Sequence, residues 1–170
     1  MNDDTHHNPR VAALGAQLAE AHDRLRERVE RLRQSIATTP GYAAGDLPAP
    51  PPGLPGDVRE HCLAFCQALN AHHEGEDDGL FALLRTSEPA LGPTVDKLIE
   101  DHHLISGILA RVDAIARGGG QRARLVGELD GLMAIMDSHF AYEERSITAA
   151  IDRLGATAAG RPWSAAVFTS

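Results

Sequence analysis

The chain has 170 residues, of which 43% are hydrophobic and only 4% are aromatic. This length fits a single domain, and a core built from aliphatic rather than aromatic side chains favours a helical bundle over a β-sheet fold. Acidic residues outnumber basic ones by 24 to 16, and the resulting formal charge of −8 argues against nucleic acids or anionic membrane surfaces as partners.

The cysteines and the N-terminal sequence bear on the cellular compartment. Cys62 and Cys66 lie four residues apart on one predicted helix, where the geometry for a disulfide is poor, so we expect reduced thiols. The sequence MNDDTHHNPR has no apolar signal core. No apolar run in the sequence approaches the roughly 20 residues that a transmembrane helix needs. These features predict a cytoplasmic protein that does not span a membrane.

Four segments carry apolar residues at alternating spacings of three and four, which is typical of one helical face. After a flexible start at residues 1–9, they run from about Val11 to Ala37, Asp57 to Arg85, Pro93 to Gly118 and Arg122 to Leu154. A Pro- and Gly-rich stretch, TTPGYAAGDLPAPPPGLPGD, separates the first two and predicts a long loop. We therefore predict an all-α, antiparallel up-down-up-down four-helix bundle over residues 10–155, followed by a tail at 156–170.

Histidine interrupts the apolar face of every predicted helix, and glutamate also interrupts the faces of the second and fourth. In register with the leucines, the interrupting residues are His22, His72, Glu76, His102, His139 and Glu143. The second and fourth helices each carry a histidine and a glutamate four residues apart, which places both side chains on one face. Beyond these pairs, the predicted core faces of the two helices end at Leu83 and Leu154.

The six interrupting residues are predicted to meet at one level of the bundle. His22 and His102 lie about 11 and 9 residues after the starts of their helices, and Glu76 and Glu143 lie about 9 and 11 residues before the ends of theirs. Because neighbouring helices are antiparallel, all six groups should lie roughly 15 Å from the same end. A buried carboxylate or imidazole without a partner costs several kcal/mol, and bound cations remove that cost. Imidazoles suit iron, zinc and copper, and carboxylates can bridge two ions.

Two other interpretations of these six residues are weaker. A hydrogen-bonded network without metal would be the usual explanation for a single buried histidine, but it accounts less well for four histidines and two glutamates at one level. A structural zinc site would have too many ligands for one tetrahedral ion, and thiolates are absent from the cluster. The pattern therefore predicts a pair of metal ions.

With these residues the sequence resembles the hemerythrin-like, or HHE cation-binding, family. The family pattern H…HxxxE…H…HxxxE fits the six positions above, and the phrases HHEGED, EDHHLI and SHFAYEE are similar to the family's motifs. The resemblance implies a four-helix bundle that holds two non-haem iron ions, bridged by an oxo or hydroxo group and by the two glutamates. Members of that family bind or sense oxygen or iron, or react with peroxide or nitric oxide.

One position departs from the pattern of oxygen-carrying hemerythrins, which have a second histidine one turn after the third-helix histidine. Ser106 stands at that position, so the site is expected to be one ligand short, which favours reaction with a peroxide or redox sensing over reversible oxygen carriage. His73 is a candidate substitute, but it lies about 100° off the helical face and would otherwise be a rim or surface residue. His103 is off the face in the same way.

Other residues near the motifs have expected roles of their own. Tyr42, in the predicted loop, is a further candidate ligand by resemblance to some bacterial relatives, with packing of the loop against the bundle as the alternative. Asp77 and Glu144 follow the two glutamates and are expected to accept hydrogen bonds that orient histidines. His61 is expected at the end of the bundle or partly exposed, and the two cysteines as small core residues.

Two functions follow from these expectations. In the first, the protein binds or reacts with a small oxidant such as O2, hydrogen peroxide or nitric oxide, in the manner of a catalase, a peroxidase or an oxygen-activating di-iron oxidoreductase. In the second, it is an oxygen- or iron-sensing module without turnover, whose state is read by a protein partner. The sequence identifies no catalytic acid or base.

Overall fold

The structure, a computed structural model, describes residues 13–38, 54–118 and 122–157. Within these residues it is helical and has no strand, which confirms the predicted all-α class. The elements are α1 (Leu14–Thr38), α2 (Gly56–Gly75), the π-helix η1 (Glu76–Phe81), α3 (Ala82–Ser87), the 3-10 helix η2 (Pro89–Leu91), α4 (Gly92–Gly118) and α5 (Arg122–Thr157). The predicted flexible start, most of the predicted long loop and most of the tail lie outside the described residues.

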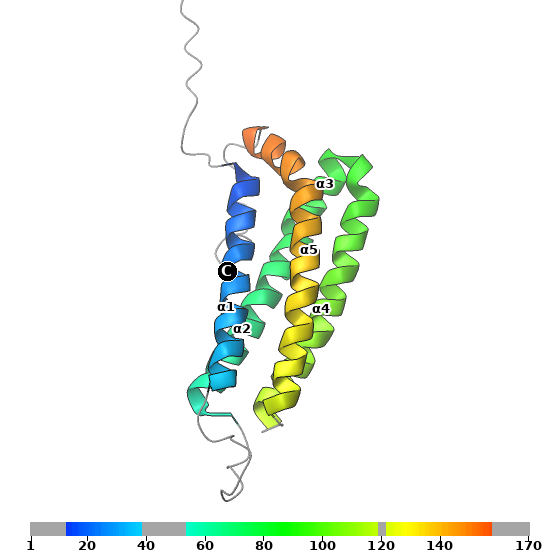
Figure 1. Ribbon diagram of the computed structural model, residues 1–170. Helices are drawn as coiled ribbons and strands as arrows, with labels where there is room; N and C mark the ends of the chain where they lie inside the picture. Colours follow the sequence, from blue (N-terminus) through cyan, green and yellow to red (C-terminus); the bar gives the residue numbers. More distant parts are fainter. Residues whose placement is uncertain (1–12, 39–53, 119–121, 158–170) are drawn as a thin grey trace, which may run out of the picture.

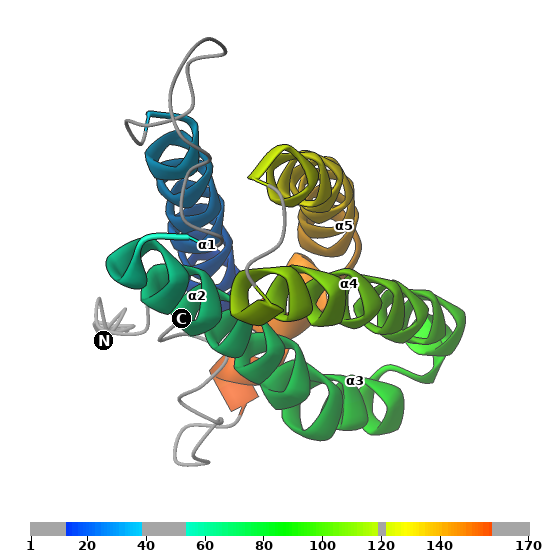
Figure 2. The same cartoon turned by 90° about the horizontal axis from the view of Figure 1, so that it is seen from below.

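The helices form four rods around a common interior (Figure 1). The second rod consists of α2, η1 and α3, which follow one another without interruption. Successive rods run in opposite directions, and α1 and α4 each lie beside both α2 and α5, as the view along the bundle shows (Figure 2). The predicted up-down-up-down four-helix bundle is confirmed.

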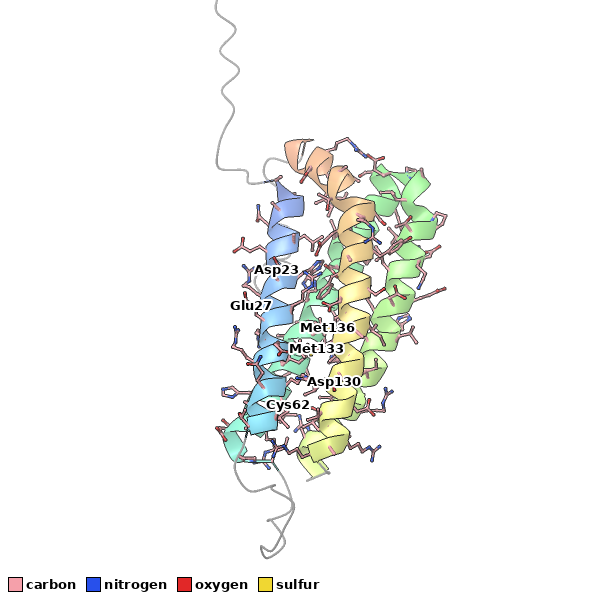
Figure 3. All side chains as sticks on the ribbon, viewed as in Figure 1. Asp23, Glu27, Cys62, Asp130, Met133 and Met136 are labelled. Carbon is pink, nitrogen blue, oxygen red and sulfur yellow. The ribbon has the colours of Figure 1, made fainter. Side chains whose placement is uncertain are left out.

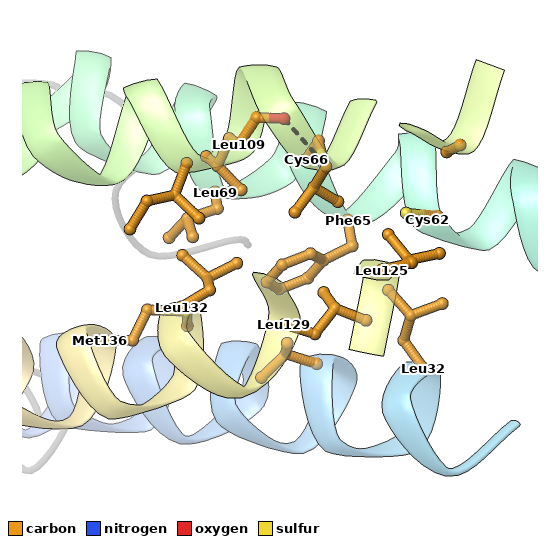
Figure 4. Close-up of a cluster of buried hydrophobic side chains, with 14 of the residues drawn as sticks. Leu32, Cys62, Phe65, Cys66, Leu69, Leu109, Leu125, Leu129, Leu132 and Met136 are labelled. Atoms are coloured by element: carbon orange, nitrogen blue, oxygen red, sulfur yellow. Dashed lines mark hydrogen bonds between the residues drawn. The ribbon is translucent and has the colours of Figure 1, made fainter. Parts of the chain in front are cut away.

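A layer of polar residues divides the interior into two hydrophobic clusters. The upper cluster lies near the start of α1 and consists of Leu14, Leu18, Leu80, Phe81, Leu84, Val95, Leu98, Ile147, Ala150 and Ile151. The lower cluster, shown in part in Figure 4, includes Leu25, Leu32, Phe65, Leu69, Leu109, Leu125, Leu129, Leu132 and Met136. Along α1, for example, His22 stands between Leu18 of the upper cluster and Leu25 of the lower cluster.

The two cysteines belong to the lower cluster. Cys62 and Cys66 are buried and free, and the thiol of Cys66 donates to the carbonyl oxygen of Leu109 over 3.9 Å (Figure 4). They are therefore the small core residues that the sequence predicts.

The π-helix changes which residues of the second rod face the interior. Its wider turn accommodates an extra residue, so that Leu80 and Phe81 are both buried and the next interior residue is Leu84, which is 0% exposed. Leu83, which the regular 3.6-residue period places in the core, is only half-buried. That prediction was wrong because the period of an α-helix does not foresee the inserted residue.

The start of α1 is held against the end of α5. The backbone N–H of Gly15 donates to Oδ1 of Asp152 over 2.8 Å, which satisfies one of the donors that a first helical turn leaves unpaired. A Cβ atom at Gly15 would lie 2.2 Å from Cγ2 of Thr148, so glycine permits this close approach. At this end of α5, Ile151 is buried, whereas Leu154 is only half-buried rather than a core residue as predicted.

Charged side chains cover the outside of the bundle. Asp23 and Glu27 point away from the interior on the outer side of α1 (Figure 3), and Glu27 pairs with Arg31 one turn further along the same helix. None of the helices in the described ranges combines the length and the apolar character that crossing a membrane requires.

Candidate metal centre

Seven polar residues form the layer between the two hydrophobic clusters, and all seven are buried. They are His22 of α1, His72 and His73 of α2, Glu76 of η1, His102 of α4, and His139 and Glu143 of α5. The six residues that interrupt the apolar faces in the sequence do point inward and meet at one level. The seventh, His73, joins them.

One half of the layer connects α1 to the second rod. His22, His72 and Glu76 each present an atom within 4.8 Å of the other two. The Nε2 atoms of His72 and His22 are 3.0 Å and 3.8 Å, respectively, from Oε1 of Glu76. The ring of His22 stacks on Phe140 with a centroid separation of 3.9 Å, which fixes the plane of the imidazole.

The other half connects α2, α4 and α5 through three imidazoles. His73, His102 and His139 present nitrogen atoms that also lie within 4.8 Å of one another. The rings of His73 and His102 stack at 4.0 Å with an interplanar angle of 11°. The Nε2 atoms of His102 and His139 are 3.0 Å apart. A cluster of three imidazoles this close is a typical arrangement for a transition-metal ion.

The two glutamates lie between these halves. Oε1 of Glu76 faces His72, while its Oε2 is 3.4 Å from Nε2 of His102 in the other half. Oε2 of Glu143 is 3.5 Å from Nε2 of His22 and 3.6 Å from Nε2 of His139. Each carboxylate thus contacts imidazoles of both halves, which is the placement that a carboxylate bridging two metal ions needs.

Burial and neighbouring charges shift the pKa values of the two layer glutamates in opposite directions. Desolvation, together with the negative charge of Glu76, raises the pKa of Glu143 well above its ordinary value. Desolvation acts on Glu76 as well, but His72 and His22 outweigh it and hold the pKa of Glu76 well below its ordinary value. The two carboxyl groups therefore differ, and Glu143 holds a proton more strongly than Glu76 does.

Two imidazoles of the second half, those of His73 and His139, lose their protons more easily than a free imidazole. Desolvation and the proximity of His102 lower the pKa of His73 well below its ordinary value, and the same causes lower the pKa of His139 to about 4. A metal ion binds the neutral form of imidazole, so these rings are already in the form that coordination requires.

Two layer histidines have acidic partners on their outer nitrogen, as the sequence predicts. Nδ1 of His22 is 2.8 Å from Oε1 of Glu144, and Nδ1 of His102 is 2.8 Å from Oδ1 of Asp77. The hydrogen bond with His22 lowers the pKa of Glu144. For His22, desolvation lowers the pKa, but the hydrogen bond with Glu144 and the negative charge of Glu76 outweigh it, so the net shift is upward. Both contacts turn Nε2 toward the layer.

His73 lies in the layer because α2 has two neighbours. The ring of His72 meets His22 of α1 edge to face, and the ring of His73, about 100° further round the helix, stacks on His102 of α4. The part of the α2 surface that faces the interior is therefore wider than a single apolar face. The prediction that His73 would otherwise lie on the rim assumed a single inward direction.

The remaining sequence candidates do not join the layer. His103 and Ser106 of α4 and His61 of α2 are exposed. Tyr42 lies outside the described residues. Phe140 and Asp101 were missed, although each is adjacent in sequence to a layer histidine and touches another element from there.

The donor set fits metal ions better than a hydrogen-bonded network. Within the described residues, both ring nitrogens of His73, both oxygens of Glu143 and Nε2 of His22 are buried without a hydrogen-bond partner. Leaving such groups unpaired costs about 1–3 kcal/mol each. Three overlapping groups in the layer have the spacing to hold metal ions, and bound cations would satisfy these atoms together. This weakens the interpretation as a metal-free polar network.

Comparison with known proteins identifies a family for this chain. Residues 14–151 match the family described as the hemerythrin HHE cation-binding domain. No curated protein and no solved structure matches the chain. The matched span runs from the first residue of α1 into the last turns of α5 and contains all seven layer residues. The chain therefore belongs to the hemerythrin HHE cation-binding family.

Proposed function

We propose that the buried layer holds two non-haem iron ions and that the protein binds or reacts with a small oxidant such as O2, hydrogen peroxide or nitric oxide there. The observation that carries the proposal is the convergence of five imidazoles and two carboxylates, buried and in overlapping groups, at one level of the bundle. Imidazole and carboxylate together suit iron, and the family match supports a cation at this place.

The assignment of ligands follows the two halves of the layer. It gives His22 and His72 to one ion, His73, His102 and His139 to the other, and Glu76 and Glu143 to both. Glu144 and Asp77 orient their histidines by accepting hydrogen bonds from Nδ1. The hydrophobic clusters above and below the layer exclude water from it. When bound, paired irons supply a site at which a small oxidant can coordinate and take up electrons.

His73 alters the balance between the two functions expected from the sequence. With His73 the centre has five imidazoles, so the incomplete ligand set expected from Ser106 no longer favours turnover over reversible binding. The distinction therefore rests on measurement of turnover.

Metal content and spectra test the proposal first. We expect the protein loaded anaerobically with ferrous iron to retain two iron ions per chain and to develop near-ultraviolet charge-transfer bands after exposure to air. His72→Ala should lose iron, whereas His103→Ala, which changes an exposed neighbour of His102, should not. Full iron content in the His72 variant would contradict the assignment.

Peroxide consumption then separates the two classes of function. Many cycles of peroxide removal per iron pair would identify a catalase- or peroxidase-like enzyme. A spectral change on adding O2 or nitric oxide, without continued consumption of peroxide, would instead identify a binding or sensing module that acts through a protein partner.

A further inference from the structure

The guanidinium group of Arg26 joins α1 to α5 beside the polar layer. Its Nη1 donates to Oδ1 of Asp23 over 2.8 Å, about one turn earlier on α1. Its Nε and Nη2 reach α5, where they donate to Oδ1 of Asp137 over 3.3 Å and to Oε1 of Glu144 over 3.4 Å. Carboxylates on two helices therefore hold all three nitrogens, which gives the guanidinium a fixed position at the edge of the layer.

Arg26 contacts both of the groups that fix the ring of His22, the one residue of α1 among the seven of the layer. Oε1 of Glu144 lies 2.8 Å from Nδ1 of His22, and the same oxygen accepts from Arg26. Phe140 stacks on the His22 ring with a centroid separation of 3.9 Å and an interplanar angle of 5°. The guanidinium carbon of Arg26 lies 5.1 Å from the centroid of that phenyl ring. The contacts of Arg26 therefore limit the movement of Glu144 and Phe140 together.

The layer histidine of α4 is held in a different way. Nδ1 of His102 also has a carboxylate at 2.8 Å, that of Asp77, but no basic side chain pairs with Asp77 among the described residues. The ring of His102 instead stacks on two rings, those of His73 at 4.0 Å and Phe81 at 5.4 Å. His22 has only one stacked neighbour in the described part of the chain, so its orientation depends more on the group that holds its carboxylate.

We propose that Arg26 is a positioning residue of the candidate metal centre, which keeps Nε2 of His22 directed into the layer by holding Glu144 and Phe140 in place. The inference rests on the proposed binding of cations and adds a residue that lies outside the seven of the layer. A guanidinium suits this role because its nitrogens point in fixed directions within one plane, which the ammonium group of lysine does not reproduce.

A positioning role and a purely electrostatic role of Arg26 predict opposite effects of its removal. A positive charge beside the layer repels a cation, so if only that charge acted, Arg26→Met would bind zinc more tightly. If Arg26 positions His22, the substitution weakens binding, because outer partners of metal-binding histidines typically contribute about 10–100-fold to metal affinity. We expect Arg26→Met to weaken the binding of one of two zinc ions about tenfold, the lower end of that range. Titration calorimetry at fixed pH measures both binding steps.

Arg33→Met is the matched control for this substitution. Arg33 also lies on α1 and pairs with an aspartate of α5, Asp130, and its side chain is 36% exposed against 28% for Arg26. It lies about two turns further along α1, away from the layer. Because both variants lose partly exposed ion pairs, the Tm of the metal-free protein should change by similar amounts. Zinc affinity should fall in Arg26→Met only, and an equal fall in both variants would overturn the proposal.

A double variant tests whether Arg26 acts through Glu144. Arg26→Met and Glu144→Gln should each weaken zinc binding when made alone. In the double variant the loss should be smaller than the product of the two separate losses, because both substitutions remove the same contact. Losses that multiply in full would mean that Arg26 acts independently of Glu144, and the proposal would fail.

Cobalt(II) in place of zinc reports the geometry of the centre directly, because its visible absorption bands depend on the number and arrangement of its ligands. At full occupancy the bands of Arg26→Met should differ from those of the unmodified chain, and those of Arg33→Met should not. If the unmodified chain binds zinc but Arg26→Met binds it as tightly or more tightly, or shows unchanged cobalt bands, this inference fails while cation binding stands. If the unmodified chain binds neither ion, both fail.

Discussion

Replacing Glu143 by methionine should make the metal-free protein more stable. Glu143 is 0% exposed, and neither of its oxygens makes a hydrogen bond within the part of the chain that the structure describes. Methionine has a side chain of similar length without a charge or a strong hydrogen-bonding group. The substitution therefore removes a buried polar group that has no hydrogen-bond partner among the described residues.

The size of the effect follows from this burial. An unpaired buried polar group costs about 1–3 kcal/mol, and we expect the free energy of unfolding of the variant to rise by an amount in this range. For a chain of this size, each kcal/mol shifts Tm by about 2–4 °C, so Tm should rise by roughly 2–12 °C.

Calorimetry of chelator-treated protein measures the shift. Glu128→Met is the matched control, because Glu128 lies on the same helix but pairs with Arg111 at the surface, where ion pairs contribute about 0–1 kcal/mol. Zinc should raise the Tm of the unmodified protein and should raise that of Glu143→Met much less. If the Tm of the metal-free variant were equal to or below that of the metal-free unmodified protein, the view that Glu143 lacks a hydrogen-bond partner would be refuted.

Three further predictions concern other parts of the molecule. His73→Leu should retain one iron ion per chain instead of two, because it removes an imidazole from one half of the layer only, and elemental analysis would show this; His103→Leu should retain both. Zinc affinity should fall as the pH is lowered from about 7.5 to 5.5, because the raised pKa values of His22 and Glu143 mean that the cation must displace protons there; calorimetry in buffers of different ionisation enthalpy would detect proton release, and affinity independent of pH would contradict it. Gly15→Ala should lower Tm, because the overpacking against Thr148, about 1–3 kcal/mol, exceeds the gain of up to about 1 kcal/mol in helix propensity; Thr148→Ser removes the clashing Cγ2 and should restore much of the loss.

The sequence predicted the parts of the fold that depend on regular periodicity. The apolar faces of α1 and α4 follow a 3.6-residue period throughout, so every residue assigned to them, including His22 and His102, is buried. The shared level of the layer was also predictable, because rise per residue and antiparallel direction fix the height of each side chain.

The features that were missed depend on contacts between helices. Leu84 replaces Leu83 in the core because η1 inserts a residue, and no periodic pattern anticipates that. His73 is buried because α4 lies beside α2 on the side toward which His73 points. Asp101 became visible only from its distance to His139, which depends on how α4 and α5 pack.

The division of the interior by a layer of ionisable groups bears on how ions reach their donors. The upper and lower clusters are joined through this layer, in which several buried nitrogen and oxygen atoms have no hydrogen-bond partner among the described residues. Such regions are where proteins open locally at the lowest free energy. If the layer binds cations as proposed, hydrated ions would enter during brief separations of the rods, and their capture would hold the rods together. Acquiring the ions and completing the fold would then be a single event.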